Sequence, residues 1–157
     1  MPVVYCFEGV ILNRFEEQCV IVTGAGSGFG EATAKRFASE KANVVVSDVE
    51  ATSAARVCDE IQKAGGKAIS ATCDVSVEAD MEHLVDKSIG EFGTVDVMVN
   101  NAGYSHMSRL LWKISVEEFD AVFAVNVKGV FLGCKHVIPR MIERKKGVIV
   151  NIASVGA

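Results

Sequence analysis

Short apolar runs alternate with longer amphipathic segments from Cys19 onward, and this alternation constrains the fold more than any other feature. Several runs consist almost entirely of Val and Ile, as expected for strands of a parallel sheet that is covered on both faces. Strands that alternate with helices build a doubly wound α/β sheet. The expected strands span residues 19–23, 43–47, 67–72, 95–100 and 147–151.

Two of the intervening segments show clear helical periodicity. The first should begin after an N-cap at Ser76, and the residues on its inward face would be Met81, Leu84, Val85, Ser88 and Phe92. The second begins with Ser115 and Glu118, which have the spacing of a capping box, and should form one long helix. Its expected inward residues are Phe119, Val122, Phe123, Val130, Cys134 and Val137.

The length and charge of the chain narrow its function class. The sequence has 157 residues, half of them hydrophobic, which suits one medium domain. We expect an N-terminal extension at 1–14 and a single domain at 15–157. The net charge of −4 and the lack of a basic stripe argue against a nucleic-acid partner. The basic cluster from Arg144 to Lys146 suits the C-terminus of a helix.

The cysteines and the apolar segments suggest a cytoplasmic protein. The five cysteines form no CxxC pair and have no metal-ligand spacing with the histidines, so we expect reduced, mostly buried thiols and no metal site. No apolar run reaches the roughly 18 residues of a membrane span, so no membrane partner is expected. The apolar start carries Glu8 and has no basic region, which argues against a signal peptide.

A glycine-rich turn follows the first expected strand, where residues 23–30 read TGAGSGFG. Such a turn from strand to helix lets the backbone approach a pyrophosphate, which the free amides of the helix N-terminus can bind. Phe29 occupies the position of the third glycine in GxGxxG, and no GK[ST] follows, which disfavours a P-loop. The remaining pattern is TGxxxGxG, formed by Thr23, Gly24, Gly28 and Gly30. A plain tight turn is the alternative interpretation of the glycines alone.

With this loop the chain resembles the short-chain dehydrogenase/reductase family. The resemblance extends from about Phe15 to the last residue and includes Asn100 to Gly103, Asn126 and the NIAS sequence at 151–154. Within the family, the chain is most similar to the 3-oxoacyl-carrier-protein reductase and glucose dehydrogenase type. The resemblance implies a Rossmann-type doubly wound parallel sheet, truncated here after the fifth strand. It also implies that the full-length protein is a homo-oligomer, either a dimer or a tetramer.

The resemblance further implies a site for a nicotinamide dinucleotide. Asp48 follows the second strand, where a carboxylate can accept hydrogen bonds from the adenosine ribose and repel a 2′-phosphate. Ser27 stands where NADP-preferring relatives usually carry a basic residue, so both positions favour NAD, with NADP less expected. The alternative is that Asp48 caps a following turn. The implied cofactor-binding residues are Gly24, Ser27, Gly28, Phe29, Gly30, Asp48, Asp74, Val75, Asn101, Ala102 and Gly103.

Asp74 and Val75 follow the third expected strand, and the resemblance places them against the adenine. For Asp74, an Asx-turn after the strand is the competing interpretation. Asn101, Ala102 and Gly103 follow the fourth strand, and the resemblance places them beside the ribose. All of these positions are at the carboxyl ends of strands, where ligands bind in doubly wound sheets.

Asn126 and Ser154 are the candidate catalytic residues. Helical counting places Asn126 on the face of Phe119, Phe123 and Val130, which should be buried, and a buried amide must be hydrogen-bonded. It is either a structural asparagine bonded to nearby backbone or, as the resemblance implies, a catalytic one that holds a water in a proton relay. By the same resemblance, Ser154 would hydrogen-bond the substrate oxygen.

The resemblance also calls for a YxxxK motif after Ser154, and the 157 residues contain none. We therefore expect the architecture of an NAD-dependent oxidoreductase that transfers hydride between NAD and a secondary alcohol or ketone, with the 157-residue chain inactive alone. A small-molecule alcohol or carbonyl compound is the expected partner, and its identity is left open. The alternative is a non-catalytic nucleotide-binding or interaction module.

Overall fold

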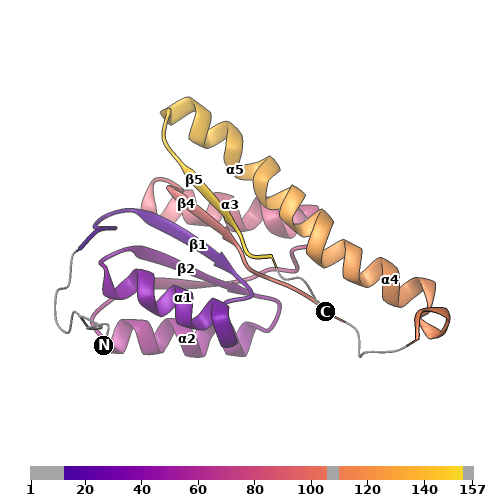
Figure 1. Cartoon of the computed structure of the whole chain (residues 1–157). Coiled ribbons are helices and arrows are strands. Elements are labelled where there is room, and N and C mark those ends of the chain that lie inside the picture. The colour runs from indigo at the N-terminus through magenta and orange to yellow at the C-terminus, as the bar shows by residue number, and fades with distance from the viewer. Residues whose placement is uncertain (1–12, 106–109, 154–157) are drawn as a thin grey trace, which may run out of the picture.

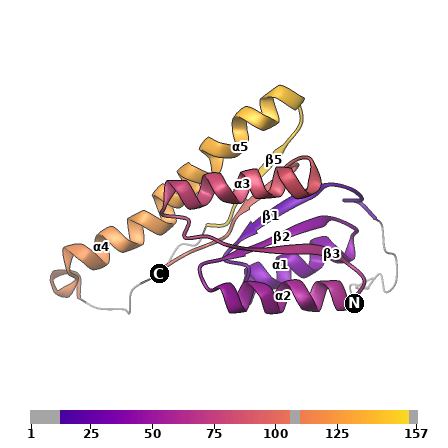
Figure 2. The same ribbon diagram turned by 180° about the vertical axis from the view of Figure 1, so that it is seen from behind.

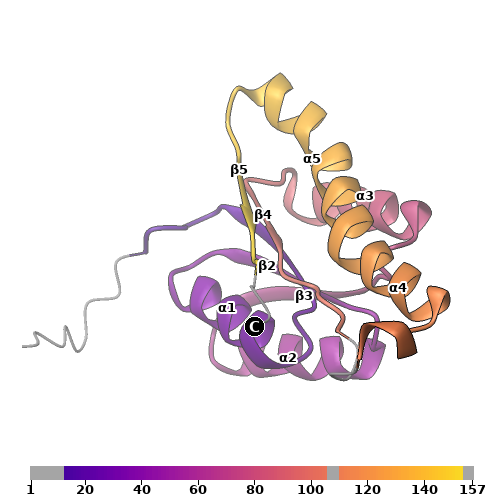
Figure 3. The ribbon, with the colours of Figure 1, turned by 45° about the vertical axis from the view of Figure 1, so that its right-hand side comes forward.

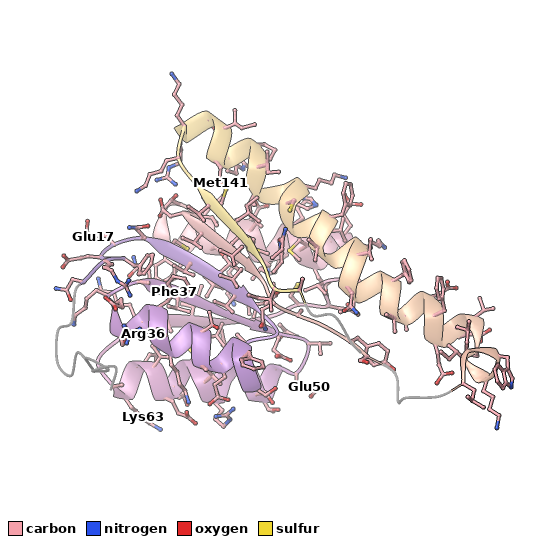
Figure 4. All side chains as sticks on the ribbon, in the orientation of Figure 1. Glu17, Arg36, Phe37, Glu50, Lys63 and Met141 are labelled. Carbon is pink, nitrogen blue, oxygen red and sulfur yellow. The ribbon has the colours of Figure 1, made fainter. Side chains whose placement is uncertain are left out.

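The computed structural model describes residues 13–105 and 110–153, which form a five-stranded parallel sheet in the order β3-β2-β1-β4-β5 (Figure 1). The expected α/β fold with a doubly wound parallel sheet is confirmed. Helices lie on both faces of the sheet, and Figure 4 labels Phe37 on α1 on one side and Met141 on α5 on the other. The strands are β1 Cys19–Thr23, β2 Asn43–Asp48, β3 Lys67–Thr72, β4 Val97–Asn100 and β5 Val148–Asn151. The helices are α1 Gly28–Ser39, α2 Ala51–Lys63, α3 Glu78–Phe92, α4 Val116–Phe123 and α5 Val130–Arg144, with a short 3₁₀ turn at Leu111–Lys113 and a π-helical segment at Ala124–Gly129.

Side chains that alternate along the strands divide the core into two layers. Val20 and Val22 of β1 pack with buried residues of α1 and α2. Cys19 and Ile21 of the same strand pack with buried residues of α3 and α5 on the other face, which Figure 2 shows from behind. Because both faces of β1 are covered, all five of its residues are buried. This explains the nearly continuous run of β-branched residues in its sequence.

The register brings the carboxyl ends of the central strands together. Val22 of β1 is paired with Val46 of β2 and with Val99 of β4. The chain therefore leaves β1, β2 and β4 at one edge of the sheet, where Thr23, Asp48 and Asn100 end these strands. Ligand sites of doubly wound sheets lie at this edge.

The predicted strand bounds are close to the observed ones. The predictions for β1 and β3 are confirmed, and β2 extends to Asp48. β4 begins at Val97 rather than at 95, and β5 at Val148 rather than at 147. Before β4, the backbone amide of Asp96 donates to Cys19 at 2.9 Å, while its carboxylate accepts the amide of Cys19 at 3.0 Å.

The predicted start of α3 was wrong. The helix begins at Glu78, and its N-cap is Val77, which has no side-chain cap. The Ser76 hydroxyl instead donates to Asp74 at 2.7 Å, because the chain turns sharply after β3 and Ser76 lies in that turn. The expected inward face holds, since Met81, Leu84, Val85 and Ser88 are buried and Phe92 is partly buried.

The predicted capping box at Ser115 and Glu118 is confirmed, but the inward face of the following helix was partly wrong. Phe119 and Phe123 are 52% and 48% exposed, whereas Val137 is fully buried. Val122, Val130 and Cys134 are partly buried. Two features explain the difference. The segment Ala124–Gly129 is π-helical, and its wider turn shifts the phase of the side chains between α4 and α5. In addition, α4 projects past the carboxyl edge of the sheet (Figure 3).

The continuous helical run Val116–Arg144 is also, by length and composition, able to cross a membrane. The run has 29 residues, and it is the one such helix in the described part of the chain. Core helices of soluble proteins meet the same criterion. Charged residues interrupt this helix, so it contains no uninterrupted apolar run of about 18 residues. The expectation of no membrane partner stays a prediction.

The described cysteines are free thiols, namely buried Cys19, Cys58 and Cys73 and partly buried Cys134, whereas Cys6 lies outside the described residues. Burial raises the pKa of Cys19 to about 12 and that of Cys73 to about 11, which keeps both thiols protonated and unreactive at neutral pH. The basic cluster lies at a helix end as expected, with α5 ending at Arg144.

Candidate functional site

A cleft of about 540 Å³ opens at the carboxyl edge of the sheet, and every residue implied for cofactor binding lines it. The glycine loop, the end of β2, the turn after β3 and the segment after β4 form its walls. Val49, Cys73, Tyr104 and Val125 complete the lining. The structure therefore brings together residues from five separate stretches of sequence, while their roles in binding stay predictions.

The glycine loop has the shape of a cradle for a phosphate group. Gly24 and Gly28 adopt positive φ angles of 62° and 57°, which side chains rarely tolerate. A Cβ atom on Gly24 would also lie 2.8 Å from the Cα of Ala102. Because α1 begins at Gly28, the amides of its first turn have no acceptor within the helix and point out of its N-terminus, where they can bind an anion. These glycines fit the pyrophosphate of a dinucleotide.

Thr23 joins the glycine loop to the segment after β4. Its buried hydroxyl accepts the backbone amides of Asn101 and Ala102, both at 3.1 Å, and donates to Val99 at 3.3 Å. The side-chain amide of Asn101 donates to the Thr23 carbonyl at 2.8 Å. Sequence reasoning used Thr23 only as a motif position and missed this role, although a hydroxyl directly before the first glycine was the available signal.

Asp48 faces the cleft and also orders the backbone around it. One carboxylate oxygen accepts the Gly26 amide at 2.8 Å, and the other accepts the Glu50 amide at 3.0 Å. The second contact is the turn-capping role considered as the alternative. Capping and ribose binding use different lone pairs of the carboxylate, so the two are compatible.

Asp74 forms the Asx-turn that was its competing interpretation. Its Oδ1 accepts the backbone amide of Ser76 at 2.9 Å and the Ser76 hydroxyl at 2.7 Å. The Asp74 backbone amide donates to Asp80 in α3 at 3.0 Å, which fixes the start of this turn. Asp74 and Val75 both line the cleft, and their contact with an adenine stays a prediction.

The expectation that Asn126 is buried was wrong, because Asn126 is exposed. It lies in the π-helical segment, where the phase of the helix changes and α4 leaves the sheet. Its carboxamide clamps Tyr104 from both sides, accepting the Tyr104 amide at 2.8 Å and donating to the Tyr104 carbonyl at 2.8 Å. This is the backbone-bonded arrangement that was considered as its structural alternative. Short π-helical segments frequently occur at functional sites.

Ser154 lies outside the described residues. The strand before it ends beside β4, where the Asn100 side chain donates to the Asn151 side chain at 2.8 Å and the Ile152 amide donates to Asn100 at 3.0 Å. In the described ranges, no group of three or more His, Cys, Asp or Glu could hold a metal ion.

Comparisons with known proteins agree with this geometry. The family model described as short chain dehydrogenase matches residues 18–157. The chain is 42% identical over 137 residues to glucose 1-dehydrogenase 2 of Bacillus subtilis, covering 86% of this chain and 53% of that protein. It thus spans about half the length of the curated relatives it matches.

Solved structures show the same fold. A 3-ketoacyl-(acyl-carrier-protein) reductase from Brucella melitensis, complexed with NADH, superposes with a TM-score of 0.83 at 41% identity, covering 88% of this chain and 58% of that one. A metagenomic short-chain oxidoreductase in complex with NADP gives a TM-score of 0.86 at 35% identity, covering 90% of this chain and 64% of that one. Similar structures therefore include complexes with NADH and with NADP.

Proposed function

The chain belongs to the short-chain dehydrogenase family, a family of oxidoreductases, and from this premise we propose that it binds NAD in the cleft at the carboxyl edge of its sheet. The proposed reaction would move hydride between a secondary alcohol or ketone and this cofactor. One observation carries the proposal: the glycine loop, Asp48 and the segment after β4 line a single cleft.

Different residues of the cleft would bind different parts of the dinucleotide. The amides at the start of α1 would bind the pyrophosphate, and Asp48 would accept hydrogen bonds from the adenosine ribose. Asp74 and Val75 would line the adenine pocket, and Asn101 to Gly103 would lie beside the second ribose. When bound, the nicotinamide supplies the hydride acceptor or donor.

Asp48 and Ser27 support a preference for NAD over NADP. A second negative charge, on the 2′-phosphate, would face the Asp48 carboxylate, and Ser27 offers it no cation. Similar proteins carry either nucleotide, so they support a nicotinamide cofactor in general. Titration with NADH and NADPH at one ionic strength tests the proposal. We expect the tighter binding for NADH, and tighter binding of NADPH would overturn it.

Catalysis is assigned to Ser154 and Asn126 together with residues that the 157-residue sequence lacks. Oxidation of an alcohol requires a base to take the hydroxyl proton while hydride leaves the carbon. In the family resemblance that base is the tyrosine of YxxxK, whereas Tyr5 and Tyr104 belong to no such motif. We propose that the polypeptide of residues 1–157 binds the cofactor without turnover. Turnover by this polypeptide would contradict the assignment.

The partners are proposed to be a small alcohol or carbonyl substrate and further copies of the chain, in the cytoplasm. Large apolar side chains are exposed along α4, the π-helical segment and α5, with Phe119, Phe123, Val127 and Phe131 each about half exposed or more. Such a patch supports burial against a second copy of the chain rather than against a nucleic acid, whose phosphates would need basic side chains. Light scattering of the purified protein would show a dimer or tetramer, and a monomer would contradict this part of the proposal.

A further inference from the structure

Both backbone polar groups of Gly26 are held by side chains of neighbouring elements. Its amide donates to Asp48 Oδ2 at 2.8 Å, and its carbonyl accepts from Arg56 Nη2 at 2.9 Å. Asp48 ends β2, and Arg56 lies in the second turn of α2. A Cβ atom on Gly26 would be 2.7 Å from the Cβ of Ser53, so the loop packs directly against the start of α2.

Arg56 is itself fixed by two carboxylates. Its Nη2 lies 2.6 Å from Glu31 Oε2, and its Nη1 lies 2.8 Å from Glu60 Oε1. Glu31 is in the first turn of α1, the helix that starts from the glycine loop. Arg56 therefore bonds to the loop, to α1 and to α2 at once, with the planar geometry that suits a guanidinium.

Lys35 of α1 shares the same carboxylates but has no contact with the loop among those described. Its Nζ lies 2.5 Å from Glu31 Oε1 and 2.6 Å from Glu60 Oε2. The electrostatic attraction between α1 and α2 is thus common to Lys35 and Arg56. The hydrogen bond to Gly26 belongs to Arg56, which makes Lys35 a matched control.

We propose that Arg56 is a positioning residue that preorganises the glycine loop for the dinucleotide. This inference rests on the proposed function of the cleft. Glycine peptides rotate easily because glycine has no Cβ. By holding the Gly26 carbonyl, Arg56 keeps the Gly26 amide on Asp48 and keeps the loop that leads into α1 in one conformation. Without this contact, binding must also order the loop, which lowers affinity.

The charge of Arg56 is balanced by Glu31 and Glu60, so the guanidinium acts as a hydrogen-bond donor to the loop rather than as a free cation for a phosphate. The hydrogen bonds from Arg56 and Lys35 lower the pKa of Glu31 to about 2, and the balancing charge therefore persists throughout the neutral range. If Arg56 instead bound a 2′-phosphate, its removal would weaken NADPH binding selectively.

The test compares Arg56→Met and Lys35→Met in the full chain. Arg56 is 47% exposed, so its replacement leaves the core intact.

The measurements are hydrogen exchange of the loop amides 25–28 without nucleotide, followed by the affinities for NADH and NADPH. In Arg56→Met we expect faster exchange at Gly26 and NADH binding weaker by roughly three- to tenfold, the scale of one lost hydrogen bond. In Lys35→Met, the exchange rate at Gly26 and the NADH affinity should both stay at the wild-type level. Arg56→Lys, which keeps the charge, should not rescue the loop.

Three results would overturn the proposal. Equal effects of Arg56→Met and Lys35→Met on exchange and affinity would show that Arg56 acts only through the ion pairs that join α1 to α2. An unchanged exchange rate of the Gly26 amide in both Arg56 variants would show that the contact of Arg56 does not order the loop. A loss confined to NADPH would make it a phosphate ligand. Failure of the wild type to bind either nucleotide would overturn the proposed function instead, while the exchange comparison would still test Arg56.

Discussion

The hydroxyl of Thr23 accepts the backbone amides of both Asn101 and Ala102 at 3.1 Å, although Thr23 and Asn101 are 78 positions apart in the sequence. The Asn101 side chain completes the contact by donating to the Thr23 carbonyl at 2.8 Å. The first residue of the glycine motif therefore fixes the distance between two walls of the cleft. A dinucleotide bound as we propose would span these two walls.

Thr23→Val is expected to lower the free energy of unfolding by about 1–3 kcal/mol, because two partly buried amides lose their acceptor while the shape of the side chain is kept. Thr23→Ser retains the hydroxyl and should lose less. Chemical denaturation of the three proteins measures the difference. Equal stability of the wild type and Thr23→Val would show that the amides find other partners.

The sequence predicted the fold and the gathering of the cleft residues because both depend on local patterns. Alternating apolar strands and a glycine turn are visible without any knowledge of tertiary contacts, and the bounds of β1 and β3 followed from them. The carboxyl-edge rule for doubly wound sheets then placed Asp48, Asp74 and Asn101 at one edge.

What the sequence did not predict depends on contacts between distant residues. Helical counting assumed a regular helix through Asn126, but the π-helical segment changes the phase there, and the residue is exposed. Likewise, the contact of Arg56 with Gly26 joins residues 30 positions apart and follows from the packing of α2 against the loop. No periodicity or motif encodes such a contact.

Replacing both Asp48→Ala and Ser27→Arg should shift the nucleotide preference toward NADP by at least about tenfold, because a carboxylate is removed and a cation is supplied. Asp48→Asn is the matched control, since it removes the charge but keeps an oxygen that can accept the Gly26 amide. Titrations with NADH and NADPH at fixed salt measure the ratio. An unchanged ratio in the double variant would mean that the ribose pocket is misplaced.

The stability of the loop region should depend on pH through Glu31. Hydrogen bonds from Arg56 and Lys35 lower the pKa of Glu31 from 4.5 to about 2 in the folded protein. A lowered carboxyl pKa stabilises the fold above the unfolded value, and this stabilisation is lost as the pH falls from about 4.5 toward 2. Glu31→Gln should therefore lower Tm at pH 6 and flatten its fall in this acidic window. Parallel Tm profiles for the two proteins would contradict the assignment.

Asn126 provides the sharpest test of the proposed catalytic assignment, because the structure gives it a second role. Its carboxamide accepts and donates at Tyr104, so Asn126→Ala frees the segment after β4 as well as removing a polar group from the site. Asn126→Asp keeps the oxygen that accepts the Tyr104 backbone amide but loses the NH₂ group that donates to the Tyr104 carbonyl. This variant therefore tests the NH₂ group of Asn126 while one of its two hydrogen bonds to Tyr104 is kept.

In a protein that also contains YxxxK, Asn126→Ala and Ser154→Ala should each lower kcat by roughly 100-fold if the residues act in proton transfer. Ser154→Ala should leave the NADH Kd unchanged, since the serine is assigned to the substrate. Asn126→Ala should raise that Kd as well, because Tyr104 and Gly103 line the same cleft. Stopped-flow binding and steady-state rates separate the two effects. A higher NADH Kd with an unchanged kcat in Asn126→Ala would show that Asn126 only holds Tyr104 in place. An unchanged kcat in Ser154→Ala would show that the serine takes no part in the reaction.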